Sequence, residues 1–327
     1  MKAAVISSYG GPDVISIQDR PIPRPVRGEV RVRVRAAPVT SGDARLRSGN
    51  VPRGMGLILR AVLGWRRPRI AAGWGFSGII DGLGDGVAGL AIGQRVFGIK
   101  GVSGGSHAEY LTIAASGAVL PLPDSLTDEE GAAFFFGGLT AAEFLIDKAQ
   151  LKAGEKVLIC GATGAVGGAA VQIATHLGAH VTAVASAPNL DLARRMGAAA
   201  VHDYRTGPVQ GQFDVVLDVM GTLAWEGARG LLANGGRLCL ITADLSATLG
   251  AVVRSKRAGR HLFAGTASES RAMMERLVQL HRAGGYRPVL GQVLPFAQLA
   301  KAHALAETFH KPGNLVVVMA TRPQPRV

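Results

Sequence analysis

The chain has 327 residues, of which 48% are hydrophobic and 18% are charged. This composition is globular rather than disordered, and the length predicts two domains that each bury a core. The formal net charge of +13 suits a nucleic acid or an anionic membrane, but no helix-turn-helix, zinc-finger or RNP-type pattern accompanies the arginines. Attraction of an anionic cofactor is a sufficient use for the charge, so nucleic acid is not the expected partner.

The sequence predicts neither a signal peptide nor a membrane span. Its first residues, MKAAVISSYGGPDV, hold no continuous apolar stretch of the length that the hydrophobic region of a signal peptide requires. Elsewhere no run approaches twenty apolar residues without a charge or a break. Cys160 and Cys239 both stand inside apolar runs, which predicts buried thiols rather than a disulfide. We therefore expect a cytoplasmic protein.

Residues 1–122 predict a compact, mostly β domain. Valines and arginines alternate over 30–35, which indicates a strand with one solvated face. Glycines interrupt residues 73–105 every few positions, and 108–113 is typical of a further strand. The apolar and basic segment 53–69 is interpreted as a mobile flap or a packed insertion, with contact to a membrane or a partner as the alternative.

Prolines at 121 and 123 mark the boundary to a second domain, 123–265. A helix is expected over 124–150, because Ser125 or Thr127 can cap it and three acidic residues favour its first turn. From residue 156 onward, strands alternate with helical patterns. The expected strands are 156–160, 181–185, 199–202, 213–218, 236–241 and 261–265. Such alternation predicts a doubly wound parallel sheet.

A glycine-rich turn follows the first of these strands. Gly161, Gly164 and Gly167 stand between an apolar run and a helical pattern, and a second apolar run begins after Gly178. Strand, glycine turn, helix and strand is the order of a dinucleotide-binding unit, although Ala162 replaces the first glycine of G-x-G-x-x-G. A pyrophosphate can approach a helix N-terminus closely only where side chains are absent. The turn therefore predicts a nucleotide site.

The end of the second strand bears on which cofactor binds. NAD-preferring folds usually place an acid there to accept from the ribose 2′-hydroxyl, whereas this strand ends at Ser186. Ser186 does not repel a 2′-phosphate, and cationic or phenolic contacts are available from the residues that follow. These residues are Arg194, Arg195, Tyr204 and Arg205. Asp191 is an alternative acid for the ribose, but an acid at this position more commonly stabilises the N-terminus of its own helix electrostatically. NADPH is therefore favoured, with NADH as the alternative.

Two later strands end near the same crevice. Ligands of such sheets lie beyond the carboxyl ends of the strands, so residues 219–221 and 241–243 should line the cofactor. These ranges supply Met220 and Thr242 as candidate contacts. Beyond them, a helix over 269–283, an extended piece over 288–296 and a terminal strand over 315–320 are expected.

Several segments together resemble the medium-chain dehydrogenase/reductase superfamily, and within it the zinc-independent quinone oxidoreductase (zeta-crystallin-like) branch. They occur in the family's order over almost the whole chain. The matching segments are 1–3, 28–30, 37–43, 93–97, 107–110, 161–167, 214–218 and 313–316.

This resemblance implies a GroES-like catalytic domain, a Rossmann domain, and a return of residues 266–327 to the catalytic domain. It implies that Thr163, Gly164, Ala165 and Val166 contact the pyrophosphate. It also implies that Ser186 and Tyr204 approach the adenosine phosphate and that Asn314 approaches the nicotinamide half. A homodimer is expected.

Departures from the zinc-dependent members narrow the chemistry. Those enzymes present a Cys in the early loop and a His-Glu pair after a Gly, where this chain reads TSGD over 40–43 and GWG over 73–75. Two cysteines cannot build either metal site, so no metal site is expected. The related quinone reductases usually carry an Asn where Thr40 stands, so Thr40 is the candidate substrate or nicotinamide contact, with a turn-forming role as the alternative. Arg45 and Arg47 are interpreted as simple surface charges.

The leading hypothesis is a zinc-free, NADPH-dependent oxidoreductase that reduces a quinone or an α,β-unsaturated carbonyl by hydride transfer. Without a Lewis acid, reduction of a polarised acceptor demands less than oxidation of an alcohol. One alternative is an NAD(P)-dependent alcohol dehydrogenase-type enzyme with an unrecognised acid or metal. The other is a nucleotide-sensing or RNA-binding protein on the same fold.

Overall fold

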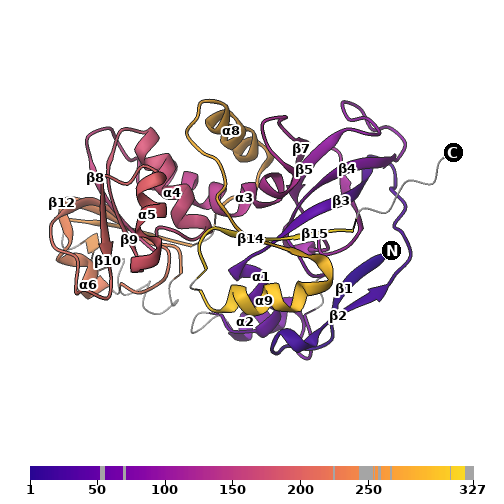
Figure 1. The fold of residues 1–327 in the computed structure, drawn as a ribbon, viewed down its shortest axis with the longest axis horizontal. Helices are drawn as coiled ribbons and strands as arrows, with labels where there is room; N and C mark the ends of the chain where they lie inside the picture. Colours follow the sequence, from indigo (N-terminus) through magenta and orange to yellow (C-terminus); the bar gives the residue numbers. More distant parts are fainter. Residues whose placement is uncertain are drawn as a thin grey trace.

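The computed structural model describes the chain except for residues 52–55, 69–70, 224, 243–252, 254, 257–258, 266, 310 and 321–327. Its elements are arranged around two large sheets that lie side by side along the long axis of the molecule (Figure 1). The parallel sheet is built from the middle of the chain, and the mixed sheet is built from both ends.

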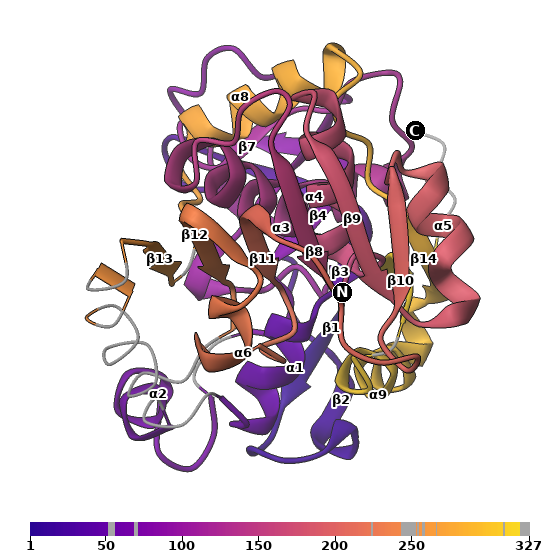
Figure 2. The same cartoon turned by 90° about the vertical axis from the view of Figure 1, so that its left-hand side faces the viewer.

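The parallel sheet has six strands in the order β10-β9-β8-β11-β12-β13, which Figure 2 shows fanned across the view. The strands are β8 (Lys156–Cys160), β9 (His180–Ala185), β10 (Ala200–Asp203), β11 (Phe213–Asp218), β12 (Leu232–Leu240) and β13 (His261–Ala264). The connecting helices include α4 (Ala165–His176), α5 (Leu190–Arg195) and α6 (Trp225–Arg229). The predicted doubly wound sheet is confirmed, and its strand order reverses between β8 and β11, where such sheets bind ligands.

The mixed sheet follows the order β14-β15-β3-β4-β5-β7, and β6 also pairs with β3. Its strands are β3 (Glu29–Val39), β4 (Gly75–Leu83), β5 (Arg95–Ile99), β6 (Tyr110–Ala114), β7 (Val119–Pro121), β14 (Leu290–Pro295) and β15 (Asn314–Val318). A separate hairpin comprises β1 (Lys2–Ile6) and β2 (Ile15–Asp19). Because β15 pairs antiparallel with β3, the last strand of the described residues is anchored in the same sheet as Glu29–Val39.

Short helices surround this sheet. They are η1 (Pro12–Val14), α1 (Ser41–Ser48), α2 (Gly56–Leu63), η2 (Gly101–Ser103), η5 (Phe296–Gln298) and α9 (Leu299–Glu307). Within the predicted basic segment, α2 is held by Tyr9, whose hydroxyl donates to Gly64 O at 2.8 Å and whose ring faces Arg60. Residues 53–55 and 69 of that segment lie outside the described part of the chain.

Helix α3 (Asp128–Ala142), continued by η3 (Glu143–Lys148), lies between the two sheets (Figure 1). Thr127 caps it in a reciprocal capping box with Glu130, so Thr127 rather than Ser125 is the cap. Phe134 and Phe135 are buried in one continuous core with Phe97 of the mixed sheet and with strand β8 of the parallel sheet. Burial of each Phe side chain contributes about 1.5–3 kcal/mol to the free energy of folding. Because these side chains contact residues of both sheets, their burial holds the two halves of the molecule together.

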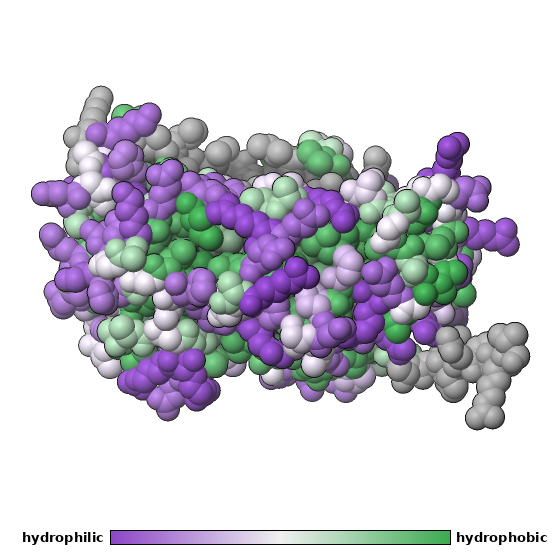
Figure 3. Space-filling view, turned by 90° about the horizontal axis from the view of Figure 1, so that it is seen from above, coloured by the Kyte–Doolittle hydropathy of each residue, from purple (hydrophilic) through white to green (hydrophobic). Residues whose placement is uncertain are grey.

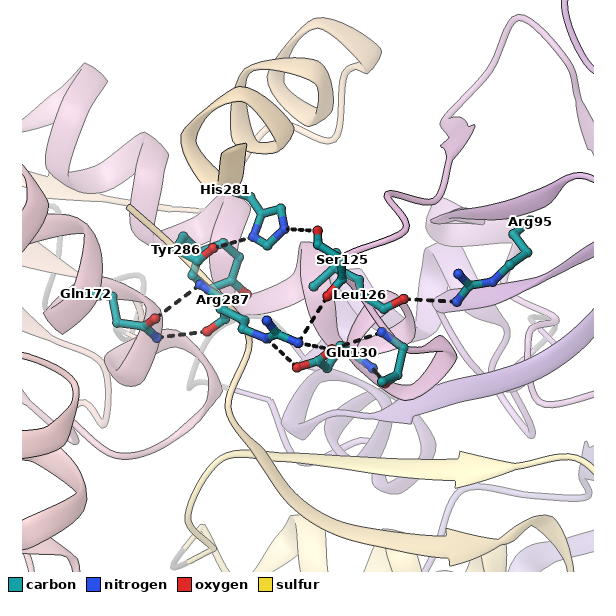
Figure 4. A network of polar contacts seen from close by, with 9 residues as sticks. Arg95, Ser125, Leu126, Glu130, Gln172, His281, Tyr286 and Arg287 are labelled. Atoms are coloured by element: carbon teal, nitrogen blue, oxygen red, sulfur yellow. Dashed lines mark hydrogen bonds and ion pairs between the residues drawn. The ribbon is translucent and has the colours of Figure 1, made fainter. Parts of the chain in front are cut away.

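A polar network reinforces this junction at the surface (Figure 4). Arg287 pairs with Glu130 of α3 at 2.6 Å, and its backbone N–H donates to Gln172 Oε1 of α4 at 3.1 Å. In α8 (Arg271–Arg282), His281 Nε2 lies 2.9 Å from Ser125 Oγ. Helices α3, α4 and α8 are thereby tied together by side chains on one side of the molecule.

Seen from above, where α8 lies, hydrophilic side chains gather across the middle of the molecule (Figure 3). No helix in the described part of the chain is both long and apolar enough to cross a membrane.

Candidate cofactor and acceptor site

The glycine-rich turn joins β8 to α4 and is shaped by absent side chains. Gly161 has φ 78°, a left-handed conformation that favours glycine. A Cβ on Gly167 would lie 2.0 Å from Gly161 O, so this glycine permits the helix to pack on the turn. A Cβ on Gly164 would meet only Gly161 O, at 3.7 Å, and would otherwise enter open space.

This open space fits the diphosphate of a dinucleotide. Gly164 is the N-cap of α4 and supplies no side-chain cap, so the first N–H groups of the helix face the crevice without a competing hydroxyl or carboxylate. Thr163, Ala165 and Val166 flank Gly164 in the turn and the first turn of α4. The four residues predicted to contact the pyrophosphate therefore lie together at the carboxyl end of β8.

Ser186 and Tyr204 meet at the carboxyl ends of β9 and β10. Asp203 is paired with Ala185, which places Tyr204 opposite Ser186, and Tyr204 N–H donates to Ala185 O at 3.3 Å. The Arg205 guanidinium carbon lies 5.6 Å from the centre of the Tyr204 ring. A hydroxyl, a phenol and a guanidinium thus lie together at the carboxyl ends of β9 and β10.

The other candidates near the adenosine end have different partners. Arg194 pairs with Asp191 at 2.6 Å within α5, and both side chains are exposed. Arg195 lines an open groove with Gln172 and Thr175. Of the four predicted phosphate contacts, the structure therefore brings Tyr204 and Arg205 to Ser186.

The loop after β11 is organised by a buried carboxylate that the sequence reasoning missed. Asp218 accepts hydrogen bonds from the backbone N–H groups of Met220, Gly221 and Leu223 at 3.0, 2.9 and 2.7 Å. Burial raises the pKa of Asp218, and these hydrogen bonds oppose the rise by stabilising its charged form. The Met220 side chain covers Gly161, as the Cγ atom would lie 2.6 Å from a Cβ there. Met220 thus borders the glycine turn, and its contact with a cofactor stays a prediction.

Thr242 follows β12 and is the last described residue before a gap. Its hydroxyl donates to Val219 O at 3.4 Å, which joins the ends of β11 and β12. Residue 243, which was also expected to line the cofactor, lies outside the described residues.

The segment before β15 brings the mixed sheet to the glycine turn. Gly313 N–H donates to Thr163 O at 2.7 Å, and Gly313 pairs with Gly164 in an isolated parallel bridge. Asn314, which begins β15, is buried, and its side-chain amide donates to Val289 O at 3.0 Å. Leu315 pairs with Val39, so Asn314 lies opposite Thr40 in the same register.

Lys311 is a second residue that the sequence reasoning missed. Its ammonium donates to Gly313 O at 3.4 Å, beside the glycine turn. Burial lowers the pKa of Lys311 to about 8, and the charge of Asp43 opposes this shift. The available signal was its position, two residues before the Gly313-Asn314 segment that carries the family resemblance. The Lys311 ammonium thus lies near Asp43 of α1 and beside Gly313, whose N–H is bonded to the glycine turn.

Thr40 and Asp43 form the start of α1 on the opposite wall. Thr40 Oγ1 donates to Asp43 Oδ2 at 2.5 Å and accepts from Asp43 N–H at 3.1 Å, in a reciprocal capping box. A Cβ on Gly42 would lie 3.3 Å from Thr40 Oγ1, 3.5 Å from the Phe136 ring and 3.6 Å from the Trp74 ring. One hydroxyl and two aromatic rings therefore converge at this end of α1.

Trp74 is held in place by a carboxylate. Its Nε1–H donates to Glu269 Oε2 at 3.3 Å, and burial raises the pKa of Glu269.

Among the described residues, no three His, Cys, Asp or Glu side chains gather in a way that could hold a metal ion.

The interpretation of Arg47 as a surface charge is wrong. Its side chain is fully buried and is bonded to Gly10 O at 2.5 Å and to Glu307 of α9. The basic residues of α1 gave no local signal for this burial, because the partners are 37 and 260 residues away. Arg45 is half-buried and reaches Thr242 across the crevice, where Nη1 lies 3.4 Å from Thr242 Oγ1.

Comparison with known proteins agrees with this geometry. Residues 26–124 match the family described as alcohol dehydrogenase GroES-like domain, and residues 196–317 match the one described as zinc-binding dehydrogenase. The quinone oxidoreductase of Sus scrofa is 30% identical over 318 residues, which are 93% of each chain. The chain is also similar to the solved quinone oxidoreductase from Coxiella burnetii, with a TM-score of 0.86 and 25% identity over 98% of this chain and 99% of that one. The quinone oxidoreductase from Thermus thermophilus, solved alone and with NADPH, gives a TM-score of 0.77 and 31% identity over 97% of this chain and all (100%) of that one.

Two neighbouring glycines should separate cofactor binding from folding. Gly164→Ala should leave the melting temperature unchanged, because its Cβ has room, and should weaken NADPH binding about tenfold by narrowing the cradle. Gly167→Ala should instead lower the free energy of unfolding by at least about 1–3 kcal/mol through overpacking. Thermal melts and NADPH fluorescence titrations measure both. Equal losses of stability in the two variants would contradict this division.

Lys311 should make cofactor binding depend on pH. Its pKa of about 8 means that it is charged below that pH and neutral above it, so the affinity for the anionic diphosphate should fall as pH rises. We expect the NADPH dissociation constant to increase about tenfold between about pH 7 and about pH 9. Lys311→Arg should bind tightly without this dependence, and Lys311→Met should bind weakly without it. A Lys311→Met profile parallel to that of the wild type would refute the assignment.

Proposed function

Because the chain belongs to the quinone oxidoreductase branch of the medium-chain dehydrogenase/reductase superfamily, we propose that it is a zinc-free, NADPH-dependent reductase of quinones or α,β-unsaturated carbonyls. The observation that carries this proposal is the composition of the acceptor end of the crevice. A threonine hydroxyl and the rings of Trp74 and Phe136 meet around Gly42. Flat aromatic walls suit a planar conjugated acceptor, whereas zinc ligation in enzymes requires converging Cys, His or carboxylate ligands.

The preference for NADPH over NADH rests on the adenosine end. β9 ends at Ala185 and is followed by Ser186, at the position where NAD-preferring folds place a carboxylate that accepts from the ribose 2′-hydroxyl. The Asn189 side chain donates to Ser186 Oγ at 3.0 Å, which fixes the serine hydroxyl at the crevice. Tyr204 and Arg205 add a phenol and a positive charge beside it.

The chain's own contribution to the reaction is positioning and exclusion of water. When bound, the nicotinamide supplies the hydride. Asn314 and Thr40 lie opposite each other at the seam between β15 and β3, and this shared position supports a role for both at the nicotinamide half of the crevice. The Thr40 hydrogen is already donated to Asp43, so Thr40 can accept a hydrogen bond from the carboxamide but has no proton to give the acceptor. The proton that completes the reduction therefore comes from solvent.

One contact favours a second candidate, oxidation of an alcohol. The short bond from Thr40 Oγ1 to the Asp43 carboxylate is the arrangement by which a carboxylate could take a proton through a hydroxyl. Reduction of NADP⁺ by a panel of primary and secondary alcohols tests it.

The homodimer and the cytoplasmic location remain predictions.

NADPH oxidation with 1,2-naphthoquinone and with an α,β-unsaturated ketone tests the leading proposal. We expect turnover with at least one of them, and the same rate after dialysis against a chelator, because catalysis relies on proximity rather than on a Lewis acid. Activity abolished by the chelator and restored by zinc would overturn the zinc-free reading. No turnover on any acceptor, together with nucleic-acid binding that weakens steeply with salt, would favour the nucleotide-sensing or RNA-binding alternative.

Substitution at the adenosine end should change which cofactor is preferred. Ser186→Asp should repel the 2′-phosphate and accept from a ribose hydroxyl, and so should lower the ratio of NADPH to NADH affinity about tenfold or more. Tyr204→Ala should lower the same ratio to a smaller extent. Arg195→Ala is the matched control, because its side chain lines a different groove. An unchanged ratio in Ser186→Asp would place the 2′-phosphate elsewhere.

A further inference from the structure

Arg45 joins helix α1, beside the mixed sheet, to the carboxyl end of β12 in the parallel sheet. It stands in α1, and its Nη1 donates to Thr242 Oγ1 at 3.4 Å, across 197 positions of sequence. Its guanidinium carbon lies 5.2 Å from the centre of the Phe309 ring. The guanidinium is therefore held over the carboxyl end of β12, beside the strand ends that line the cofactor crevice.

Gly42, around which the proposed acceptor site is built, lies on the same face of α1 as Arg45. Gly42 and Arg45 are three residues apart in α1 and so share one face of the helix. Around Gly42 lie Thr40 and the rings of Trp74 and Phe136. Arg45 therefore stands on the same face of α1 as the position around which this hydroxyl and these two rings converge.

The charge of Arg45 is not neutralised by a carboxylate of any described residue. The partners of the guanidinium are the Thr242 hydroxyl and the Phe309 ring, and burial lowers the pKa of Arg45. Arg47, two residues further along α1, is buried more deeply but is paired with Glu307 and Gly10 O. The difference indicates that Arg47 has a structural role, whereas Arg45 retains donors for an oxygen that carries negative charge.

We propose that Arg45 is the electrophilic catalytic residue of the acceptor site, donating hydrogen bonds to the carbonyl oxygen of a planar quinone or enone. This inference rests on the proposed function. Hydride adds to the conjugated acceptor with its electron pair, the acceptor π electrons move onto the carbonyl oxygen, and that oxyanion then takes a proton from water. The acceptor is reduced and the nicotinamide is oxidised. A guanidinium favours the oxyanion over the neutral carbonyl, so it lowers the barrier rather than merely improving binding.

Three variants test this assignment. Arg45→Met removes the charge, Arg45→Gln keeps a hydrogen-bond donor to Thr242 without the charge, and Arg45→Lys keeps the charge without the planar fork. Arg282→Met is the matched control, because Arg282 is exposed in the last turn of α8. For Arg45→Met and Arg45→Gln we expect kcat to fall about 100-fold to 1000-fold, with the NADPH dissociation constant within about threefold of the wild type. Arg45→Lys should lose less, and added guanidinium ion should partly rescue Arg45→Met.

A binding measurement keeps this test separate from turnover. With NADP⁺ present, quenching of tryptophan fluorescence measures binding of 2-hydroxy-1,4-naphthoquinone, which is an anion at neutral pH, and of neutral 1,4-naphthoquinone. Arg45→Gln should weaken binding of the anion about tenfold or more and leave binding of the neutral quinone nearly unchanged. An unchanged anion affinity, or a defect confined to NADPH binding, would overturn the role of Arg45. Failure of the wild type to reduce any acceptor would refute the proposed function instead, while the binding measurement would still decide whether Arg45 holds an anionic oxygen.

Discussion

The hydrogen bond from Gly313 N–H to Thr163 O, at 2.7 Å, is the contact on which the arrangement of the site depends. It joins the segment that enters β15 to the glycine turn that leaves β8, and so connects the mixed sheet to the parallel sheet at the crevice. Because β15 also pairs with β3, the same contact sets Asn314 opposite Thr40. The relative positions of Asn314, Thr40 and the glycine turn are therefore set by backbone hydrogen bonds, whose geometry does not depend on flexible side chains.

Buried charges in this molecule fall into two groups with different consequences. Arg47 is compensated by Glu307 and a carbonyl, and Asp218 is compensated by backbone N–H groups, so both fix local structure. Arg45 and Lys311 lie at the crevice without a comparable bond to a described carboxylate. Under the proposed function, a bound dinucleotide would bring negative charge beside these cations and relieve the cost of desolvating them.

Most of the parallel sheet and its turn followed from local patterns. The predicted strand 213–218 coincides with β11, and 156–160 coincides with β8, because runs of buried residues bounded by turns are visible within a few positions. The helix predicted over 124–150 was correct in place, but only the structure distinguished Thr127, the cap, from Ser125, which bonds to His281 instead. The cap at Thr127 is completed locally by Glu130, three residues later, whereas the partner of Ser125 lies on α8, some 150 residues later in the chain, so no local pattern records that second contact.

The sequence by itself determined the Rossmann unit and its glycine-rich turn, because glycine spacing and strand periodicity act over short distances, and its resemblance to known segments indicated the superfamily. Tertiary structure alone decided the environments of Arg45, Arg47 and Lys311. All three are basic residues whose partners lie on other elements of the fold. Arg45 contacts Thr242, Arg47 pairs with Glu307, and Lys311 interacts with the charge of Asp43. The charge of a side chain can be read from the sequence, whereas its desolvation and its partners exist only once the two sheets have come together.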